Sequence, residues 1–209
     1  MVDSRPEGPL LIQFAKWPEK GRVKTRLAAS IGDEKALAAH IRLTEHVLDN
    51  LHATGFPLQL WWNKPPGASA AAPGLIQKIR SLHLEEQVQV GSDLGERMSH
   101  ALVEGLRVCR SVIIVGSDCP AVDEDYILQA IQRLQGTEVV LGPADDGGYI
   151  LLGARRAKAG MLSGVRWGSH HALADTEKTL KRMNLSVSRL EARWDVDDNE
   201  DWERYLATL

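Results

Sequence analysis

The segment Val112-Ile113-Ile114-Val115-Gly116-Ser117-Asp118-Cys119-Pro120 is the most informative part of this sequence. Its four consecutive β-branched apolar residues predict a strand that is buried on both faces, as in a parallel sheet. Pro120 favours an extended conformation at Cys119, so the chain is expected to leave the sheet there. Asp118 then lies just beyond the carboxyl end of a central strand, where open α/β sheets bind ligands. Alternatively, Asp118 caps the helix expected to begin near Asp123, and the local sequence leaves both interpretations open.

Composition limits the classes of protein to consider. The chain has 209 residues, of which 44% are apolar and 25% charged, and we expect one domain over residues 1–209. Its net charge is −3 and it has no basic block, which argues against nucleic acid as a partner. No apolar run approaches the roughly 18 residues that a membrane span needs. The charged N-terminal segment lacks the apolar core of a signal peptide and the two cysteines fit a reduced compartment, so we expect a cytoplasmic protein.

A basic loop follows the first expected strand, Leu10–Phe14. A strand followed by a glycine-bearing basic loop that enters a helix is typical of phosphate sites in α/β folds, because backbone N–H groups and side-chain cations converge on the anion. Neither a P-loop nor a GxGxxG motif is present, and a solvated basic loop is the plain alternative. Alternate residues of an extended loop point the same way, which favours a shared anion for three of its cations. These three are Arg22, Lys24 and Arg26, and Lys16 and Lys20 precede them.

Two further loops carry charged residues next to glycine. In Gly91–Met98, Arg97 opens an expected helix and either contacts a phosphate or braces a carboxylate. In Gly142–Ala154, Asp145 and Asp146 precede Gly147 and Gly148, and the glycine pair permits positive φ and close approach of a ligand. A hairpin turn with exposed aspartates is the alternative. Because this turn leaves the sheet near the same edge as Asp118, we expect Asp146 to take part in substrate binding.

The last acidic cluster lies in Arg193–Leu206. Asp195 and Asp197 alternate and can face one site together, which makes them the candidates for a second carboxylate on a metal. Asp198 and Glu200 are explained by their position at the start of a final helix, where acidic residues are stabilising. Across the chain, expected strands alternate with expected helices, among them an amphipathic helix over Asp33–Leu51 and a strand or extended segment at Val88–Val90. The sequence therefore predicts an α/β fold with a mostly parallel sheet.

Six motifs together resemble one bacterial family of glycosyltransferase-like proteins, the radical-SAM/selenodomain-associated transferases of the nucleotide-diphospho-sugar transferase superfamily. The motifs are AKWPEKGRVKTRLA, GSDLGERM, VGSDCP, LGPADDGGYILLG, RWG and DVDDNED, and they span roughly Leu10–Leu206. The resemblance implies the GT-A fold, a three-layer α/β/α sandwich with a Rossmann-like, mostly parallel sheet that binds a nucleotide at the carboxyl ends of its strands.

The resemblance also implies roles for individual residues. In that superfamily a carboxylate after the central strand binds Mg²⁺ or Mn²⁺ bridging the nucleotide's phosphates, which corresponds to Asp118 here, and Asp197 matches a second metal ligand. Lys24 is implied as a catalytic cation and Asp146 as the group that binds or deprotonates the acceptor. The turn of Asp145, Gly147 and Gly148 resembles an acceptor-side loop. The nucleotide and phosphate contacts are expected from Lys16, Arg22, Lys24, Arg26 and Arg97.

Three functions follow as hypotheses. The first is transfer of a sugar from a nucleotide-sugar to a small-molecule acceptor. The second is nucleotidyl transfer from an NTP with release of pyrophosphate, because KTRLA, the glycine-pair loop and the DVD segment also resemble 2-phospholactate guanylyltransferases. Asp118 is followed by Cys119-Pro120, whereas glycosyltransferases of this fold usually carry D-x-D, and this arrangement is closer to nucleotidyltransferases. The third is a nucleotide-binding regulatory module without turnover.

Overall fold

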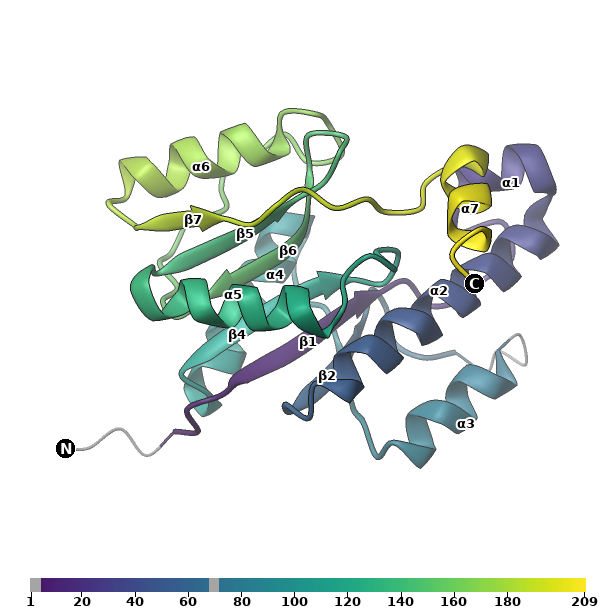
Figure 1. The fold of residues 1–209 in the computed structure, drawn as a ribbon, viewed down its shortest axis with the longest axis horizontal. Helices are drawn as coiled ribbons and strands as arrows, with labels where there is room; N and C mark the ends of the chain where they lie inside the picture. Colours follow the sequence, from purple (N-terminus) through teal and green to yellow (C-terminus); the bar gives the residue numbers. More distant parts are fainter. Residues whose placement is uncertain (1–4, 68–71) are drawn as a thin grey trace.

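The computed structural model describes residues 5–67 and 72–209, and its centre is a seven-stranded sheet (Figure 1). The strand order is β3-β2-β1-β4-β6-β5-β7. All neighbouring strands are parallel except the two pairs that contain β6, because a tight turn joins β5 to β6 as an antiparallel hairpin. The mostly parallel α/β sheet predicted from the sequence is confirmed. The strands are β1 (Pro9–Ala15), β2 (Leu58–Trp62), β3 (Glu85–Val88), β4 (Ser111–Gly116), β5 (Val139–Pro143), β6 (Tyr149–Ala154) and β7 (Val187–Arg189).

Helices cover both faces of the sheet and make the three layers expected of this fold (Figure 1). The described helices are α1 (Thr25–Ile31), α2 (Asp33–Ala53), α3 (Pro73–Ser81), α4 (Leu94–Val108), α5 (Glu124–Gly136), α6 (Ala172–Arg182) and α7 (Asn199–Leu206). One apolar core joins α2, α3 and α5 to the sheet, and a second joins α4 and α6 to the opposite face. None of the helices in residues 5–67 and 72–209 has the length and apolar character of a membrane-spanning helix.

Strand β4 shows why the central segment folds as it does. Ile113 and Val115 belong to the first core, whereas Val112 and Ile114 belong to the second, so the strand is buried on both faces as predicted. The helix after it is capped by Asp123, whose carboxylate accepts a hydrogen bond of 2.8 Å from the backbone N–H of Tyr126. Helix capping therefore does not explain Asp118.

One strand differs from the sequence expectation. We expected an extended segment at Val88–Val90, but β3 covers Glu85–Val88 and Val90 is exposed. The strand lies at the edge of the sheet and pairs only with β2 among the described residues. Its polar residues Glu85, Glu86 and Gln87 give no alternating apolar pattern, because an edge strand buries little of either face.

A segment after β7 completes the edge of the sheet at which β1 and β4 end (Figure 1). This crossing segment, residues 191–198, runs from β7 to α7 and passes beside the end of β4, where the Val196 N–H donates to the Asp118 carbonyl oxygen at 2.9 Å. Val196 and Tyr205 pack against Leu43 of α2 in a small apolar cluster. Distant parts of the chain are therefore held together at the sheet edge where a ligand was expected.

Candidate functional site

A cavity of about 430 Å³ lies at the carboxyl ends of the parallel strands. Its wall includes residues that follow β1, β2, β3 and β4, the first turns of α1 and α4, the beginning of β6, and the crossing segment. This is the place where open α/β sheets bind ligands. Asp118, Lys24, Arg26, Lys16, Arg97 and Asp197, all expected from the sequence as site residues, line it.

Three carboxylates converge on one side of this cavity. Asp118, Asp195 and Asp197 each offer an oxygen, and these atoms all lie within 4.8 Å of one another. Asp118 comes from the end of β4 and the other two come from the crossing segment. Gly116 permits the tight bend at Asp118, because a Cβ at Gly116 would lie 2.9 Å from the Asp118 Oδ1 atom. The sequence named Asp195 and Asp197 as candidates for the second carboxylate, with Asp197 the better match, and the structure brings both together with Asp118.

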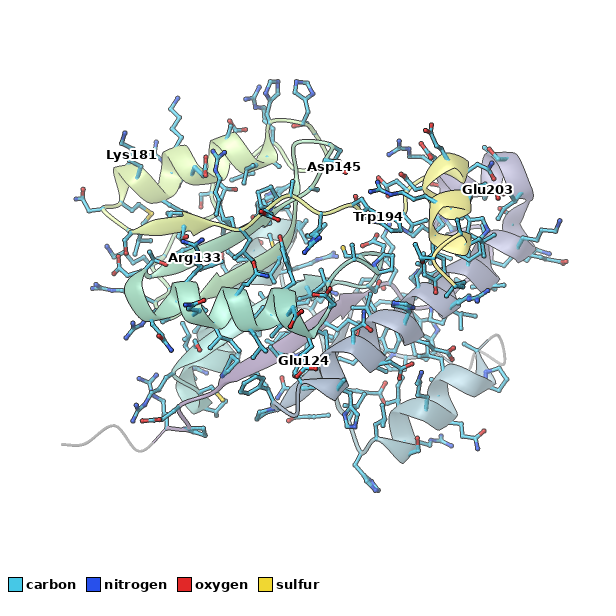
Figure 2. The ribbon with its side chains drawn as sticks, viewed as in Figure 1. Glu124, Arg133, Asp145, Lys181, Trp194 and Glu203 are labelled. Atoms are coloured by element: carbon cyan, nitrogen blue, oxygen red, sulfur yellow. The ribbon has the colours of Figure 1, made fainter. Side chains whose placement is uncertain are left out.

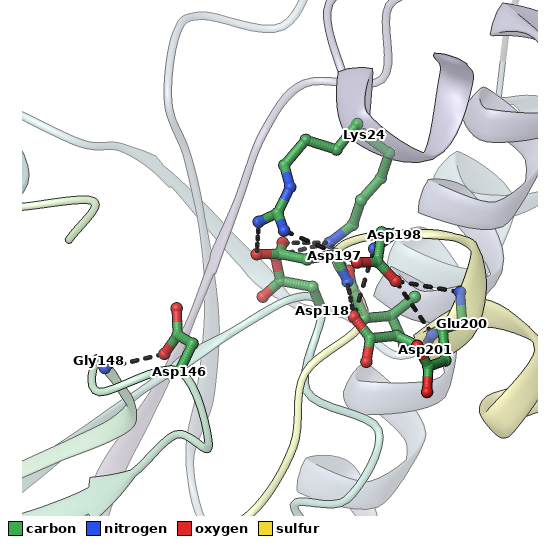
Figure 3. A network of polar contacts seen from close by, with 10 residues as sticks. Lys24, Asp118, Asp146, Gly148, Asp197, Asp198, Glu200 and Asp201 are labelled. Atoms are coloured by element: carbon green, nitrogen blue, oxygen red, sulfur yellow. Dashed lines mark hydrogen bonds and ion pairs between the residues drawn. The ribbon is translucent and has the colours of Figure 1, made fainter. Parts of the chain in front are cut away.

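Lys24 lies between the carboxylates from the two segments (Figure 3). Its Nζ is 2.9 Å from Asp118 Oδ2 and 3.8 Å from Asp197 Oδ1, and it also donates to the Val196 carbonyl oxygen. The Lys24 side chain is 6% exposed, whereas that of Asp118 is 36% exposed. Lys24 adopts φ 45°, a left-handed conformation that is costly for a residue with a Cβ, immediately before α1. Such strain is typical of functional sites.

The electrostatics of the cluster follow from this crowding. Burial acts to raise the pKa of Asp118, but the Lys24 ammonium outweighs burial and lowers that pKa to about 2. Burial acts to lower the pKa of Lys24, but Asp118 and Asp197 outweigh it, so the pKa of Lys24 is raised. Asp195 forms no ion pair with any residue that the structure describes. Burial and then the charges of Asp118, Asp197 and Asp146 raise its pKa to about 7. The cluster therefore holds more negative charge than its own lysine neutralises.

The basic loop is only partly arranged as expected. Arg26 donates to Asp197 Oδ2 at 2.8 Å, and its side chain is 67% exposed. Lys16 lines the cavity, and its carbonyl oxygen is 2.9 Å from Nε2 of the buried His40. Arg22 is exposed and lies outside the wall of the cavity. The chain enters α1 at Thr25, so it is not extended through all three residues as the alternation assumed, and a phosphate contact of Arg22 stays a prediction.

Arg97 lies at the first turn of α4, on the wall of the cavity. Its Nε donates to the Gly91 carbonyl oxygen at 3.1 Å. Within residues 5–67 and 72–209 it forms no ion pair, so the bracing of a carboxylate, one of two expectations for it, is not observed there. The geometry leaves its terminal guanidinium nitrogens for a ligand.

The turn with the glycine pair lies beside the cavity and not in its wall. The Gly148 N–H donates to Asp146 Oδ1 at 2.8 Å. Asp146 lies apart from Asp118 (Figure 3) and does not line the cavity. Gly147 adopts φ 88°, and a Cβ there would overlap the backbone of His170. Asp145 lies at the tip of the turn, on the side where the crossing segment carries Trp194 (Figure 2), and its carboxylate is 3.8 Å from Arg204.

Other polar residues of the site had not been predicted. His40 is 3% exposed on α2 and lines the cavity, and burial lowers its pKa. Asn63 and Gln89 line the cavity beyond the ends of β2 and β3. Cys119 is buried, and burial raises the pKa of its thiol well above the ordinary value. A single polar residue after a strand or on a helix gives no pattern that a sequence reader can separate from ordinary surface.

The sequence of residues 47–169 matches the model of a family described as "Uncharacterized protein conserved in bacteria (DUF2064)". The chain belongs to the DUF2064 family. No curated protein matches its sequence. A protein from Desulfovibrio desulfuricans G20, proposed to be a nucleotide-diphospho-sugar transferase, is 29% identical and has a TM-score of 0.84, over 97% of this chain and 88% of that chain.

More distant solved structures share the fold of this DUF2064 protein. CMP:2-keto-3-deoxy-manno-octonic acid synthetase, complexed with CTP, is 9% identical with a TM-score of 0.57, over 96% of this chain and 98% of that one. Rv0371c from Mycobacterium tuberculosis H37Rv, in complex with manganese, is 15% identical with a TM-score of 0.53, over 97% of this chain and 100% of that one. The DUF2064 chain therefore has the fold of nucleotide-diphospho-sugar transferases, and nucleotidyl or sugar-nucleotide transferases are among its structural neighbours. The radical-SAM/selenodomain-associated subfamily stays an expectation from the motifs.

Proposed function

We propose that this protein is a metal-dependent transferase that moves a sugar from a nucleotide-sugar to a small-molecule acceptor. The observation that carries the proposal is the convergence of Asp118, Asp195 and Asp197 beside Lys24 in a cavity at the carboxyl ends of the strands. Relatives support the class of reaction: the Desulfovibrio protein is a proposed nucleotide-diphospho-sugar transferase, and the synthetase with the same fold binds CTP.

The residues present fit a divalent cation of the Mg²⁺ or Mn²⁺ type. Carboxylate oxygens are the donors that these cations prefer, and the crowding that raises the pKa of Asp195 is what a cation in the cluster would relieve. Rv0371c, which shares the fold, was solved with manganese. Asp118, Asp195 and Asp197 would hold the metal, which would stabilise negative charge on the departing diphosphate.

The cationic side chains have distinct tasks in this proposal. Lys24 is buried and fixed between two carboxylates, so it positions Asp118 and Asp197 and presents its charge to the phosphates. Lys16, Arg26 and Arg97 lie around the cavity and bind the outer phosphate oxygens. Arg22 lies outside the cavity wall and has no part.

The acceptor approaches beside the turn of Asp145–Gly148. Asp146 has one oxygen engaged by the Gly148 N–H, and the other remains to bind or deprotonate an acceptor hydroxyl. Close packing of Gly147 on the His170 backbone keeps this turn in place. An acceptor bound here would lie on the same side of the sheet as the carboxylate cluster, because Asp146 is near enough to raise the pKa of Asp195.

Nucleotidyl transfer is the second candidate, because Cys119-Pro120 replaces the second aspartate of D-x-D and the added carboxylates come from the crossing segment. In that reaction a substrate phosphate attacks the α-phosphorus of an NTP, and pyrophosphate leaves. The products separate the two functions. Nucleoside diphosphate released from a nucleotide-sugar, with a mixture of small metabolites as acceptors, supports sugar transfer, whereas pyrophosphate released from an NTP supports nucleotidyl transfer.

A thermal-shift screen tests the common basis of both reactions. Nucleotides and nucleotide-sugars are screened with and without Mn²⁺ or Mg²⁺, and a ligand at about 100 times its Kd should stabilise the fold by about 2.7 kcal/mol. We expect the shift to require metal and to disappear in Asp118→Asn, while Asp49→Asn, a surface change on α2, retains it. The proposal is contradicted if no nucleotide raises the melting temperature of the wild-type protein with metal present.

A further inference from the structure

Two side-chain amides lie at the end of the cavity away from the carboxylates. Asn63 follows β2 and Gln89 follows β3, and both line the cavity. In the sheet order β3-β2-β1-β4, they stand two and three strands from the strand that carries Asp118. Neighbouring strands are about 4.8 Å apart, so the amides are roughly 10 to 14 Å from the carboxylate end. The cavity therefore has two chemically different ends that face one continuous space.

Gln89 can present only its carbonyl oxygen to the cavity. Its Nε2 donates to the carbonyl oxygens of Trp61, at 2.8 Å, and Ala15, at 3.4 Å. Backbone carbonyls accept hydrogen bonds and never donate, so the amide cannot be turned round without losing both contacts. Gln89 is 9% exposed, which makes that loss costly. Its Oε1 has no hydrogen-bond partner among the described residues.

Asn63 is fixed in the opposite sense. Its Oδ1 accepts a hydrogen bond of 2.8 Å from the backbone N–H of Trp17. A backbone N–H only donates, so this orientation is also determined by its partner and leaves Nδ2 as a donor. Within the part of the chain that the structure describes, Nδ2 has no partner. The two amides thus offer one fixed acceptor and one fixed donor on the same wall.

We propose that Asn63 and Gln89 recognise the hydrogen-bonding edge of a nucleobase. This inference rests on the proposed function as a transferase that binds a nucleotide. Gln89 Oε1 accepts from an N–H of the base, and Asn63 Nδ2 donates to the neighbouring ring nitrogen or carbonyl oxygen. Every nucleobase has such a donor beside an acceptor on one rigid, planar edge, which inorganic pyrophosphate lacks. With the base at this end, the phosphates extend toward Lys24 and the carboxylate cluster.

Replacing Asn63→Asp tests the inference by changing one atom. The new side chain still accepts from the Trp17 N–H, but it faces the cavity with an acceptor in place of a donor. Guanine has two adjacent N–H donors on its edge, whereas adenine, cytosine and uracil have one donor beside an acceptor. We therefore expect the affinity for GDP relative to ADP, CDP and UDP to rise about tenfold, since one matched or mismatched hydrogen bond is worth about that factor. Calorimetric titration with Mn²⁺ measures the affinities of the four diphosphates and hence the three ratios.

The controls separate base recognition from charge and from folding. Inorganic pyrophosphate has no base, so its affinity reports the general effect of the added charge and should not follow the base ranking. Asn184→Asp makes the same chemical change at an exposed position outside the cavity wall and should leave all three ratios unchanged. Asn63→Ala should weaken all four nucleoside diphosphates about tenfold and leave pyrophosphate binding as it was.

The result that overturns the inference is an unchanged ranking of the four bases in Asn63→Asp, or an equal loss of nucleotide and pyrophosphate binding in Asn63→Ala. Either result, with metal-dependent nucleotide binding intact in the wild-type protein, leaves the proposed function standing. If the wild-type protein with Mn²⁺ binds neither pyrophosphate nor any of the four diphosphates, the proposed function fails and this inference with it.

Discussion

A buried lysine holds carboxylates from two distant segments in one place. Lys24 touches Asp118 from the end of β4 and reaches the crossing segment at Val196 and Asp197. A buried charge is costly unless it is paired, so the ammonium and its partners stabilise one another's position more than they stabilise the fold as a whole. Replacing Lys24 with a neutral residue should therefore leave the carboxylates unpaired and destabilise the protein.

We expect Lys24→Met to destabilise the protein by about 3 kcal/mol, because it leaves partly buried carboxylates without their counter-charge. Urea unfolding at neutral pH without metal measures the change. Lys20→Met is the matched control, since Lys20 forms an exposed ion pair with Glu34 that water screens, so its loss should have a much smaller effect on stability. Equal effects of the two substitutions would show that Lys24 is not paired as described.

Asp195 should make the stability of the metal-free protein fall as the pH rises. Its folded-state pKa, about 7, lies above the ordinary 3.8, so between these values the folded chain keeps a proton that the unfolded chain has released. The free energy of unfolding therefore falls with rising pH until about 7. Asp195→Asn lacks this titration, so its melting temperature should exceed that of the wild type by more at pH 8 than at pH 5.

Melting curves in EDTA at both pH values check this expectation. With Mn²⁺ added, the difference in melting temperature between Asp195→Asn and the wild type should become smaller or reverse in sign, because the wild type keeps the full set of carboxylates for the cation. A difference that is the same at both pH values would show that Asp195 is ionised normally in the fold.

At the scale of elements, the sequence was informative where burial leaves a pattern. The strand of residues 112–115 and the helix from Asp33 could be predicted from their apolar periodicity, because each buries a defined face. The strand at Glu85–Val88 was misplaced because an edge strand with exposed side chains leaves no such pattern. The antiparallel direction of β6 agrees with the hairpin turn that the sequence left open as one interpretation of the loop before it.

The site could be predicted only in part for a related reason. Asp118 and the alternating Asp195 and Asp197 stand at the ends of recognisable segments, which is why their convergence was foreseeable. Asn63 and Gln89 became visible only through the orientation that their backbone partners impose. Arg22 does not line the cavity with Lys24 and Arg26, because α1 begins at Thr25 and changes the direction of the side chains there.

The turn between β5 and β6 depends on Gly147. Gly147→Ala should destabilise the protein by clearly more than about 1 kcal/mol, since it adds the cost of φ 88° to an overlap with the His170 backbone. Gly164→Ala is the control, because Gly164 has φ 73° but nothing within 4 Å of the added Cβ, so only the conformational cost applies. Urea denaturation midpoints compare the two, and equal losses would mean that the contact with His170 has no energetic weight.

At the scale of the whole molecule, the crossing segment couples α7 to the central sheet. The Val196 N–H donates to the Asp118 carbonyl oxygen, and Val196 packs with Tyr205 and Leu43. A cation shared by Asp118 and Asp197 would bridge the same two segments a second time. Opening of this segment would then have to break both links.

We therefore expect Mn²⁺ to slow hydrogen exchange at the Val196 amide by about tenfold or more, because binding energy is added to the cost of local opening. Exchange measured by NMR or mass spectrometry, with and without Mn²⁺, tests this. The amides of β4 serve as the internal reference, since they lie in the core and should open only with the whole protein. Equal protection of Val196 in both conditions would show that the metal does not join the two segments.

Lys24 contacts Asp118, which is 94 positions away in the sequence, and Val196, which is 172 positions away. Contacts between such distant residues close large loops and tend to form late in folding. A chain still emerging from the ribosome would fold its first strands and bury their apolar faces before residues 195–197 were available. If the proposed function holds, catalytic competence would then arrive as the final event of the protein's assembly, because a partly synthesised chain lacks Asp195 and Asp197.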